Sequence, residues 1–442
     1  MTVHSATSTR VPSDIVADVR ILHVSWEYPP LVYGGLGRHV GALARAQARA
    51  GHEVVVITQT DGEPADHVVE DGVRVIRTPR PDPDLPFRAD TIIEWVAGLE
   101  SALIPACDRL AATWRPQVIH GHDWMITNTV TEAQRILAAP VVATVHATEA
   151  GRHQGWLTGE LSRSIHRTEW TLCHLATRVI ACSQHMRWEV CRLFAIPPES
   201  VSVIPNGIDR DSWTTTGDAR ATARSRFAPS GPLIVYSGRL EWEKGVHTLL
   251  EAMPLLGKDV PDAHLVVAGK GGKEADLHDL ARRLRLGRRV TFTGWLPEAE
   301  LHALIASADV AVVPSLYEPF GLVALEATAL GTPVVVADTG GLTEIADEGR
   351  AALTFPRADH EALAALLAVA LADNEGSTRR LAEARRDLQT VYDWDMIARQ
   401  TTRAYESAVA SWDGTPRVVP SPPPLPDANL LAEWEPPAAA SG

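Results

Sequence analysis

Two glutamates bracket a glycine in the stretch Glu318-Pro-Phe-Gly-Leu-Val-Ala-Leu-Glu326. Gly321 has no Cβ and so permits a close approach of the backbone to a ligand. A helix that begins near Phe320 would present free N–H groups and a positive dipole end, which suit an anion or a sugar hydroxyl. Glu318 and Glu326 can accept hydrogen bonds from sugar or ribose hydroxyls. The competing interpretation makes Glu326 a solvated helix residue and Glu318 only a capping group.

A second set of candidates is cationic. Arg239 and Lys244 follow a predicted strand at 233–238 and precede a predicted helix at 245–256. Ligands of parallel α/β sheets bind beyond the carboxyl ends of strands. Two cations beside a helix N-terminus therefore predict a diphosphate clamp, with ordinary solvated surface charges as the alternative.

Polar residues also end two earlier predicted strands, at 118–120 and 141–145. The first is followed by the run His120-Gly-His122-Asp123-Trp124 and the second by His146. Their position predicts a role in chemistry for His122, Asp123 and His146. A metal site at His120, His122 and Asp123 is the competing idea, but no further ligand lies at a recognised spacing, so we expect none. For His146 the alternative is a hydrogen-bonded strand cap.

A glycine loop at residues 26–37 links a predicted strand to a predicted helix. The dinucleotide fingerprint is absent, because Val40 stands where its third glycine would be, and no phosphate-loop sequence ending in G-K-[ST] occurs. An NAD-dependent dehydrogenase is therefore disfavoured. Gly34 and Gly35 could still cradle a phosphate through backbone N–H groups, or simply form a tight turn.

The elements that must position these residues read as two α/β series. The first opens with a βαβ unit whose strand, helix and strand are predicted at 20–25, 38–50 and 53–58. The strands of both series are continuous, valine-rich apolar runs, as expected when helices cover both faces of a parallel sheet. We therefore predict an α/β protein with two doubly wound Rossmann-like domains that face a central cleft.

The predicted domain boundaries follow from these series. We expect an N-terminal acceptor-binding domain, a C-terminal donor-binding domain, a helix that crosses back to the first domain and a proline-rich disordered tail, at residues 18–209, 210–391, 392–412 and 413–442. Residues 1–17 are expected to be disordered, and 210–231 to form a linker region that is helical in part.

Composition excludes several classes of protein. The 442 residues carry a formal charge of −14 without a basic stripe, so nucleic acid is not an expected partner. The four cysteines form no C-x-x-C pair and are expected to be reduced thiols. The sequence shows neither a secretory signal nor an apolar run long enough to span a bilayer, which predicts a cytoplasmic protein.

The residues as a set resemble the retaining nucleotide-sugar glycosyltransferases of the GT-B fold, in the branch similar to bacterial glycogen synthases. The similarity extends from about residue 20 to residue 410. It rests on these motifs: Glu27-Tyr-Pro-Pro…Gly34-Gly-Leu-Gly37, His122-Asp-Trp124, Thr144-Val-His146, Ser183-Gln, Ile204-Pro-Asn-Gly-Ile-Asp209, Ser237-Gly-Arg-Leu…Lys244-Gly and Glu318-Pro-Phe-Gly-Leu…Glu326.

For the donor, the resemblance implies that Arg239 and Lys244 hold the diphosphate and neutralise the leaving group. It places Glu318 beside the donor sugar and Glu326 at the ribose. The sugar hydroxyls would meet the amides of Phe320, Gly321, Leu322 and Val323.

For the N-terminal domain, the resemblance implies that the glycine loop at Gly34 and Gly35 contacts the donor phosphates. His146 would contact the donor glucose near its 6-hydroxyl. The acceptor would lie against the run His122-Asp123-Trp124, and the helix after Tyr392 would cross back to this domain.

The expected activity is transfer of glucose from ADP-glucose or UDP-glucose to an α-glucan or small glucosyl acceptor, with retention and α-1,4 linkage. No metal or other cofactor is expected. The chain departs from many glycogen synthases, which have Lys-x-Gly-Gly-Leu where Val32-Tyr-Gly-Gly-Leu36 stands here. His146-Ala-Thr-Glu149 resembles actinobacterial α-1,4-glucosyltransferases of glycogen and methylglucose polysaccharide synthesis.

Three alternatives stay open beside that activity. They are glucose 1-phosphate as acceptor, giving maltose 1-phosphate, a nucleotide-sugar epimerase, and a non-catalytic sugar-binding protein. The donor base, the acceptor length, the linkage and homo-oligomer formation also stay open.

Overall fold

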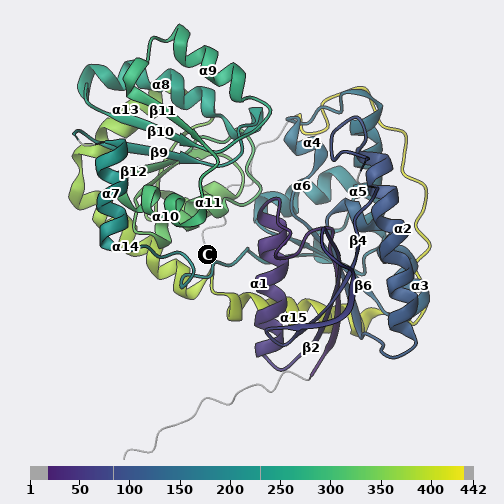
Figure 1. Cartoon of the computed structure of the whole chain (residues 1–442). Helices are drawn as coiled ribbons and strands as arrows, with labels where there is room; N and C mark the ends of the chain where they lie inside the picture. Colours follow the sequence, from purple (N-terminus) through teal and green to yellow (C-terminus); the bar gives the residue numbers. More distant parts are fainter. Residues whose placement is uncertain (1–17, 83, 229, 433–442) are drawn as a thin grey trace, which may run out of the picture.

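The computed structural model describes residues 18–82, 84–228 and 230–432, so the expectation for residues 1–17 lies outside the described chain. It has two lobes, each a sheet of mostly or wholly parallel strands with helices on both faces (Figure 1). This confirms the predicted fold class.

The N-terminal lobe is built on an eight-stranded sheet of order β3-β4-β2-β1-β5-β6-β7-β8. Its strands are β1 (Arg20–Val24), β2 (Glu53–Thr60), β3 (Ala65–Glu70), β4 (Val73–Pro79), β5 (Val118–His122), β6 (Val141–Val145), β7 (Arg178–Ala181) and β8 (Val201–Val203). Its helices are α1 (Gly35–Arg49), α2 (Ile92–Ala111), α3 (Thr127–Leu137), α4 (Glu149–Arg152), α5 (Gly159–Leu175) and α6 (Gln184–Phe194).

The C-terminal lobe has a six-stranded sheet of order β11-β10-β9-β12-β13-β14, parallel throughout. Its strands are β9 (Leu233–Ser237), β10 (His264–Ala268), β11 (Val290–Gly294), β12 (Val310–Val313), β13 (Val334–Asp338) and β14 (Leu353–Pro356). The remaining helices are α7 (Gly217–Phe227), α8 (Val246–Asp259), α9 (Glu274–Arg283), α10 (Glu298–Ser307), α11 (Leu322–Ala329), α12 (Gly341–Ala346), α13 (His360–Ala372), α14 (Asn374–Thr390) and α15 (Trp394–Ser411).

Burial explains why the central strands are so apolar. The run Val54–Ile57 of β2 is buried on both faces, because helices cover both sides of the sheet. Among the described strands, β3 at one edge of its sheet is the one that runs antiparallel. None of its positions is buried, so its pattern gave no clear strand signal. Among the described residues, no helix is both long and apolar enough to cross a bilayer.

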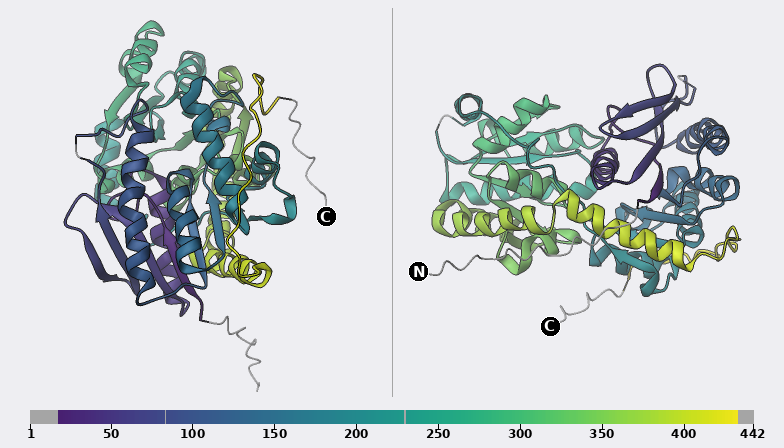
Figure 2. Two further views of the ribbon diagram at one scale, coloured as in Figure 1. Left: turned by 90° about the vertical axis from the view of Figure 1, so that its right-hand side faces the viewer. Right: turned by 90° about the horizontal axis from the view of Figure 1, so that it is seen from below.

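Helix α15 joins the two lobes on their underside (Figure 2). Asp393 caps its start by accepting hydrogen bonds from the N–H groups of Asp395 and Met396. The helix then packs against α1 of the N-terminal lobe, where Arg49 pairs with Asp395 at 2.8 Å and Tyr405 is fully buried.

The proline-rich tail differs from the expectation of a disordered segment. Residues 433–442 lie outside the described chain, but residues 413–432 run along the N-terminal lobe. Arg417 donates to the carbonyl of Ala176 at 2.8 Å, and Arg192 donates to the carbonyls of Leu430 and Ala432. Proline removes backbone N–H groups but leaves carbonyl acceptors, so an extended proline-rich segment can still be held by arginine side chains.

Candidate active site

Lys244 and Glu318 meet at the carboxyl ends of β9 and β12. Lys244 Nζ lies 2.8 Å from Glu318 Oε2, and Ser315 Oγ donates to the same oxygen at 3.0 Å. Both charged side chains are mostly buried. Gly245 makes this approach possible: its φ is +66°, and a Cβ there would lie 1.9 Å from the carbonyl oxygen of Pro314. The ammonium of Lys244 and the carboxylate of Glu318 neutralise each other.

Arg239 lies on the same loop and is more exposed. Its guanidinium pairs with Glu243 at 3.1 Å, with about half of the arginine side chain open to solvent. The Glu243 side chain is mostly buried, so a phosphate would reach the guanidinium from its solvent-exposed side.

Helix α11 presents its N-terminus beside this loop. It begins at Leu322, with Gly321 as its cap at φ +116°, and no acidic residue lies in its first turn. The expectation of a helix start near Phe320 is thus off by two residues, and Glu326 lies little more than one turn inside rather than about two. Gly341 packs so closely that a Cβ there would lie 2.6 Å from Phe320 Cα, which holds the loop against α12.

Glu326 is not a solvated helix residue, so that alternative interpretation is wrong. Its carboxylate is mostly buried and lies 3.1 Å from Arg38 Nη1 on α1 of the opposite lobe. Burial raises the pKa of Glu326 to about 7, and the Arg38 charge offsets part of that rise. Sequence reasoning missed Arg38, because nothing local connects residues 288 positions apart.

The glycine loop caps α1 and approaches α11 across the lobes. A Cβ on Gly35 would lie 2.9 Å from Leu322 Cδ1, so the two elements touch. Glu27 Oε2 accepts hydrogen bonds from the N–H groups of Tyr33 at 2.6 Å and Gly34 at 3.0 Å. The N–H of Gly34 therefore already has an acceptor, the Glu27 carboxylate. The sequence motif contained Glu27, but its role in holding the loop was not predicted.

Asp123 and His146 lie together at the carboxyl ends of β5 and β6. Asp123 adopts φ +60°, a conformation that non-glycine residues rarely take. Its Oδ1 accepts a hydrogen bond from the backbone N–H of His146 at 2.7 Å. Burial raises the pKa of Asp123 to about 6 and lowers that of His146 to about 3. Near neutral pH, Asp123 is mostly ionised and His146 is neutral.

The other two residues predicted to meet an acceptor lie deeper. His122 is fully buried and bonds His23 and His146, so it supports the site from beneath. Trp124 begins a short 3-10 turn at Trp124–Ile126 and packs partly buried against the core.

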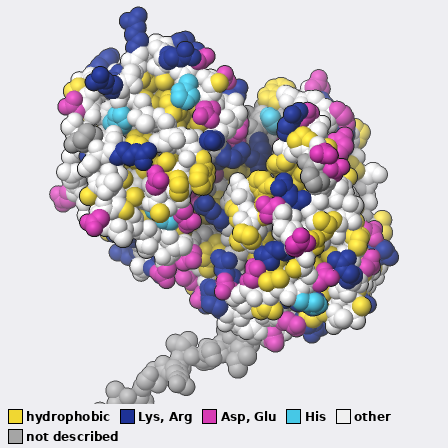
Figure 3. All heavy atoms as spheres, in the orientation of Figure 1, with side chains coloured by type: hydrophobic (Ala, Val, Ile, Leu, Met, Phe, Trp, Pro, Cys, Tyr) yellow, Lys and Arg dark blue, Asp and Glu magenta, His cyan; other side chains and the backbone are white. Residues whose placement is uncertain are grey.

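Two contacts between the lobes were not predicted. Tyr317 OH accepts from the N–H of Thr148 at 3.1 Å and lies 2.9 Å from Glu189 Oε1. Ser183 Oγ donates to the carbonyl of Pro319 at 2.7 Å. Together these contacts bring the donor loop next to α4 and the Asp123–His146 face. Figure 3 shows a hollow between the lobes at which Lys and Arg side chains gather.

Within the described part of the chain, two groups of histidines have ring nitrogens within 4.8 Å of one another, a spacing that could hold a metal ion. They are His23, His120 and His122, and His39, His122 and His146. In the first group every ring nitrogen already has a hydrogen-bond partner. Asp123, part of the metal idea from the sequence, belongs to neither group.

Two models of glycosyltransferase families match consecutive parts of the chain. A family model described as Glycosyltransferase Family 4 matches residues 33–212, and one described as Glycosyl transferases group 1 matches residues 219–387. These matches divide at the junction of the two lobes.

The chain is 41% identical over 401 residues to a glycogen synthase from Mycobacterium tuberculosis, covering 88% of this chain and 95% of that protein. It is 30% identical to an alpha-maltose-1-phosphate synthase from the same species, covering 89% and 100%. Sucrose-phosphate synthase from Thermosynechococcus elongatus has a similar structure, with a TM-score of 0.75 and 26% identity over 89% of this chain and 99% of that one.

These matches cover both lobes at once, including the loops that carry Lys244, Glu318 and His146. The chain belongs to the group 1 glycosyltransferases with the GT-B fold and is a glycogen synthase-like transferase.

Proposed function

We propose that this enzyme transfers glucose from a nucleoside diphosphate-glucose to the end of an α-glucan, with retention of configuration and α-1,4 linkage. The observation that carries the proposal is the mostly buried Lys244–Glu318 pair at the N-terminal end of α11. It puts a cation for the diphosphate and a carboxylate for sugar hydroxyls 2.8 Å apart. The glycogen synthase relative supports glucose and a glucan as the substrates.

The chemistry follows from charge. Breaking the sugar–phosphate bond leaves negative charge on the diphosphate and positive charge at the anomeric carbon. Lys244, Arg239 and the dipole of α11 stabilise the first, and fixed groups of this kind act without reorganisation. These cations take the place of a metal, so activity should persist in a chelator. Closure of the lobes would exclude water and favour transfer over hydrolysis.

Retention requires that the new bond form on the face that the diphosphate leaves. We favour attack by the acceptor hydroxyl on that face, with the departing phosphate accepting its proton. Trapping of a covalent glycosyl-enzyme would refute this step.

A second candidate acceptor is glucose 1-phosphate, which would yield maltose 1-phosphate. Two observations favour it: the similarity to an alpha-maltose-1-phosphate synthase, and the half-buried Arg152 on α4. Burial opposes the Arg152 cation, but the charges of surrounding groups, Tyr317 and Asp123 first among them, raise its pKa. A phosphate group on the acceptor would be attracted to this cation.

The direct test offers ADP-glucose and UDP-glucose separately with glycogen, maltose and glucose 1-phosphate. Products are identified by NMR, which distinguishes the anomers and the linkage. We expect α-1,4-linked glucose on glycogen or maltose. Nucleotide release without a new glycosidic bond would refute the proposal, and a dominant product from glucose 1-phosphate would support the second candidate.

Lys244→Ala should lower kcat by about 10²–10³, because it removes a preorganised charge at the leaving group. The matched control is Lys258→Ala, since Lys258 is an exposed lysine of the same lobe in the last turn of α8, the end of that helix remote from Lys244. Circular dichroism and thermal melting verify that both variants fold. Unchanged turnover in the Lys244 variant would remove this lysine from the mechanism.

A further inference from the structure

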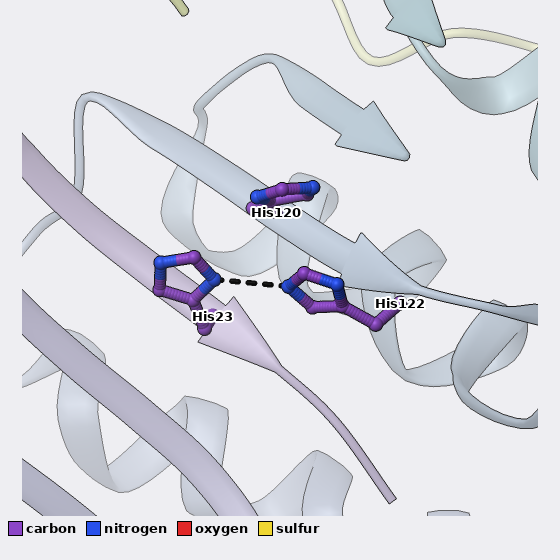
Figure 4. A group of neighbouring side chains, drawn as sticks. All are labelled: His23, His120 and His122. Atoms are coloured by element: carbon purple, nitrogen blue, oxygen red, sulfur yellow. Dashed lines mark hydrogen bonds between the residues drawn. The ribbon is translucent and has the colours of Figure 1, made fainter. Parts of the chain in front are cut away.

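Four histidines lie beneath the Asp123–His146 face, in β1, α1 and β5: His23, His39, His120 and His122. Figure 4 shows three of them, His23, His120 and His122. Burial lowers the pKa of His23 to about 4 and that of His146 to about 3. These rings are therefore neutral near pH 7. A neutral imidazole has one N–H donor and one bare nitrogen acceptor, so each hydrogen bond constrains the next.

Gln47 sets the direction of this series of bonds. Its Oε1, which can only accept, lies 2.7 Å from His23 Nε2, so the proton of His23 is on Nε2. His23 Nδ1 is then an acceptor and takes the Nε2–H of His122 at 3.0 Å. His122 Nδ1 is in turn an acceptor and takes the Nε2–H of His146 at 3.4 Å, the longest bond of the series.

This chain of constraints leaves Nδ1 of His146 as a bare acceptor. That nitrogen has no protein partner among the described residues, and the His146 side chain is only partly buried. His39 packs edge-on against the ring, with centroids 4.8 Å apart, and so restricts its rotation.

A second branch runs from the same amide. Gln47 Nε2 donates to Tyr405 OH at 3.0 Å, Tyr405 OH donates to His120 Nδ1 at 2.7 Å, and His120 Nε2 donates to Thr144 Oγ1 at 2.7 Å. Both branches start from the amide orientation of the structure, in which Oε1 faces His23 and Nε2 faces Tyr405. Turning the amide by 180° would reverse every bond in both branches, so one side chain determines the whole arrangement.

We propose that Gln47 is a positioning residue that fixes the tautomer of His146 with its proton on Nε2, so that Nδ1 accepts a hydrogen bond from a hydroxyl of the bound sugar. The identity of that hydroxyl as part of the donor rests on the proposed function. The tautomer itself does not, and it can be measured in the free protein.

The first test measures tautomers in the wild-type protein labelled with ring-¹⁵N histidine. Long-range ¹H–¹⁵N spectra separate the two neutral tautomers, and the His146→Asn variant assigns the His146 signals. We expect His146, His122 and His23 all to carry the proton on Nε2. A proton on Nδ1 of His146 would overturn the proposal whatever the enzyme's substrate proves to be.

The second test uses Gln47→Met, which removes both the acceptor and the donor at similar volume. His23 then loses the partner for its Nε2–H, and we expect His146 to populate the Nδ1–H form. We expect kcat to fall about 10- to 100-fold, with the donor KM changed less than threefold. Gln47→Glu retains an acceptor for His23, and it should restore the Nε2–H signal and most of kcat.

Tyr405→Phe is the matched control. It removes the acceptor of Gln47 Nε2 and so breaks the second branch, but it leaves in place the bonds that run from Gln47 Oε1 through His23 and His122 to His146. We expect a lower melting temperature but an unchanged His146 tautomer and an unchanged kcat. A loss of kcat in this variant equal to that in Gln47→Met would reduce Gln47 to a structural role and refute the proposal. So would stoichiometric metal in the purified protein, because a metal ion would displace these protons.

Discussion

At the scale of single residues, Asp123 has both a strained backbone conformation and a raised pKa. Its φ of +60° aims the carboxylate at the N–H of His146, and burial raises its pKa from 3.8 to about 6. The Arg152 charge lowers this pKa. Burial raises the pKa values of Glu27 and Glu169, and the Asp123 charge adds to both rises. The ionised form holds the loop between β6 and α4 in place.

Turnover should therefore fall as the pH drops through about 6, because protonated Asp123 holds the His146 backbone less well. Stability should move the other way: the folded state takes up this proton at a higher pH than the unfolded state, so acidification from pH 7 to pH 4 favours folding through this group. The measurement is kcat at saturating donor from pH 5 to 8, together with melting temperatures.

Asp123→Asn should show lower kcat without the inflection near 6, and Asp108→Asn, at an exposed position on α2, should behave as wild type. An identical inflection in the Asp123 variant would assign it to another group.

Residue types and spacing predicted Glu318, Lys244 and Glu326 as site residues, because they lie next to strand ends or a glycine in the sequence. The structure brings Lys244 and Glu318 together, and their role toward a donor stays a prediction. Arg38 and Tyr317 were missed, because each acts only across the lobes. A pairing between residues far apart in the chain depends on the packing of whole domains, which local patterns do not encode.

At the scale of elements, the loop between α4 and α5 is held from two sides. Gln154 and Gly155 on this loop contact the C-terminal segment, where Asn429 donates to the carbonyl of Gln154 at 3.0 Å and Leu430 N–H donates to that of Gly155 at 2.8 Å. From the other lobe, Arg357 donates to Gln154 Oε1 at 2.9 Å. The proline-rich segment thus holds the loop between α4 and α5, which lies shortly after His146 in the chain.

Removing residues 413–442 should loosen this loop. We expect amide exchange in residues 149–158 to accelerate at least about tenfold, about 1.4 kcal/mol, which one or two lost hydrogen bonds supply. Removing only 433–442 is the control, since it leaves all of these contacts in place. Hydrogen exchange with mass spectrometry measures both, and equal protection in the two truncations would show that the segment does not brace the loop.

The elements were predicted where apolar runs were long and regular. Strands such as β2 and β10 follow from buried valines, and α8 from its apolar stripe. The β3–β4 hairpin was missed because its edge strand alternates weakly. The order of residues 413–432 was missed because their contacts, made by Arg417 and by Arg192 on α6, join residues far apart in the chain.

At the scale of the whole molecule, the two lobes contact each other at the start of α1, the start of α6 and the segment that leads into α11. Gly35 touches Leu322, Arg38 pairs with Glu326, and Ser183 binds the carbonyl of Pro319. In the proposed complex the ribose takes the place of Arg38 at Glu326, and the diphosphate takes the place of Glu318 at Lys244. In the ligand-free protein each ion pair would then neutralise a side chain that the bound nucleotide sugar contacts instead.

The most direct test of the account is a crystal structure with ADP or UDP bound. We predict phosphate oxygens at about 2.7–3.1 Å from Lys244 Nζ and from the Arg239 guanidinium, with the ribose hydroxyls on Glu326. A nucleotide bound elsewhere, with the Lys244–Glu318 and Arg38–Glu326 pairs intact, would contradict the central claim that these side chains hold the activated sugar.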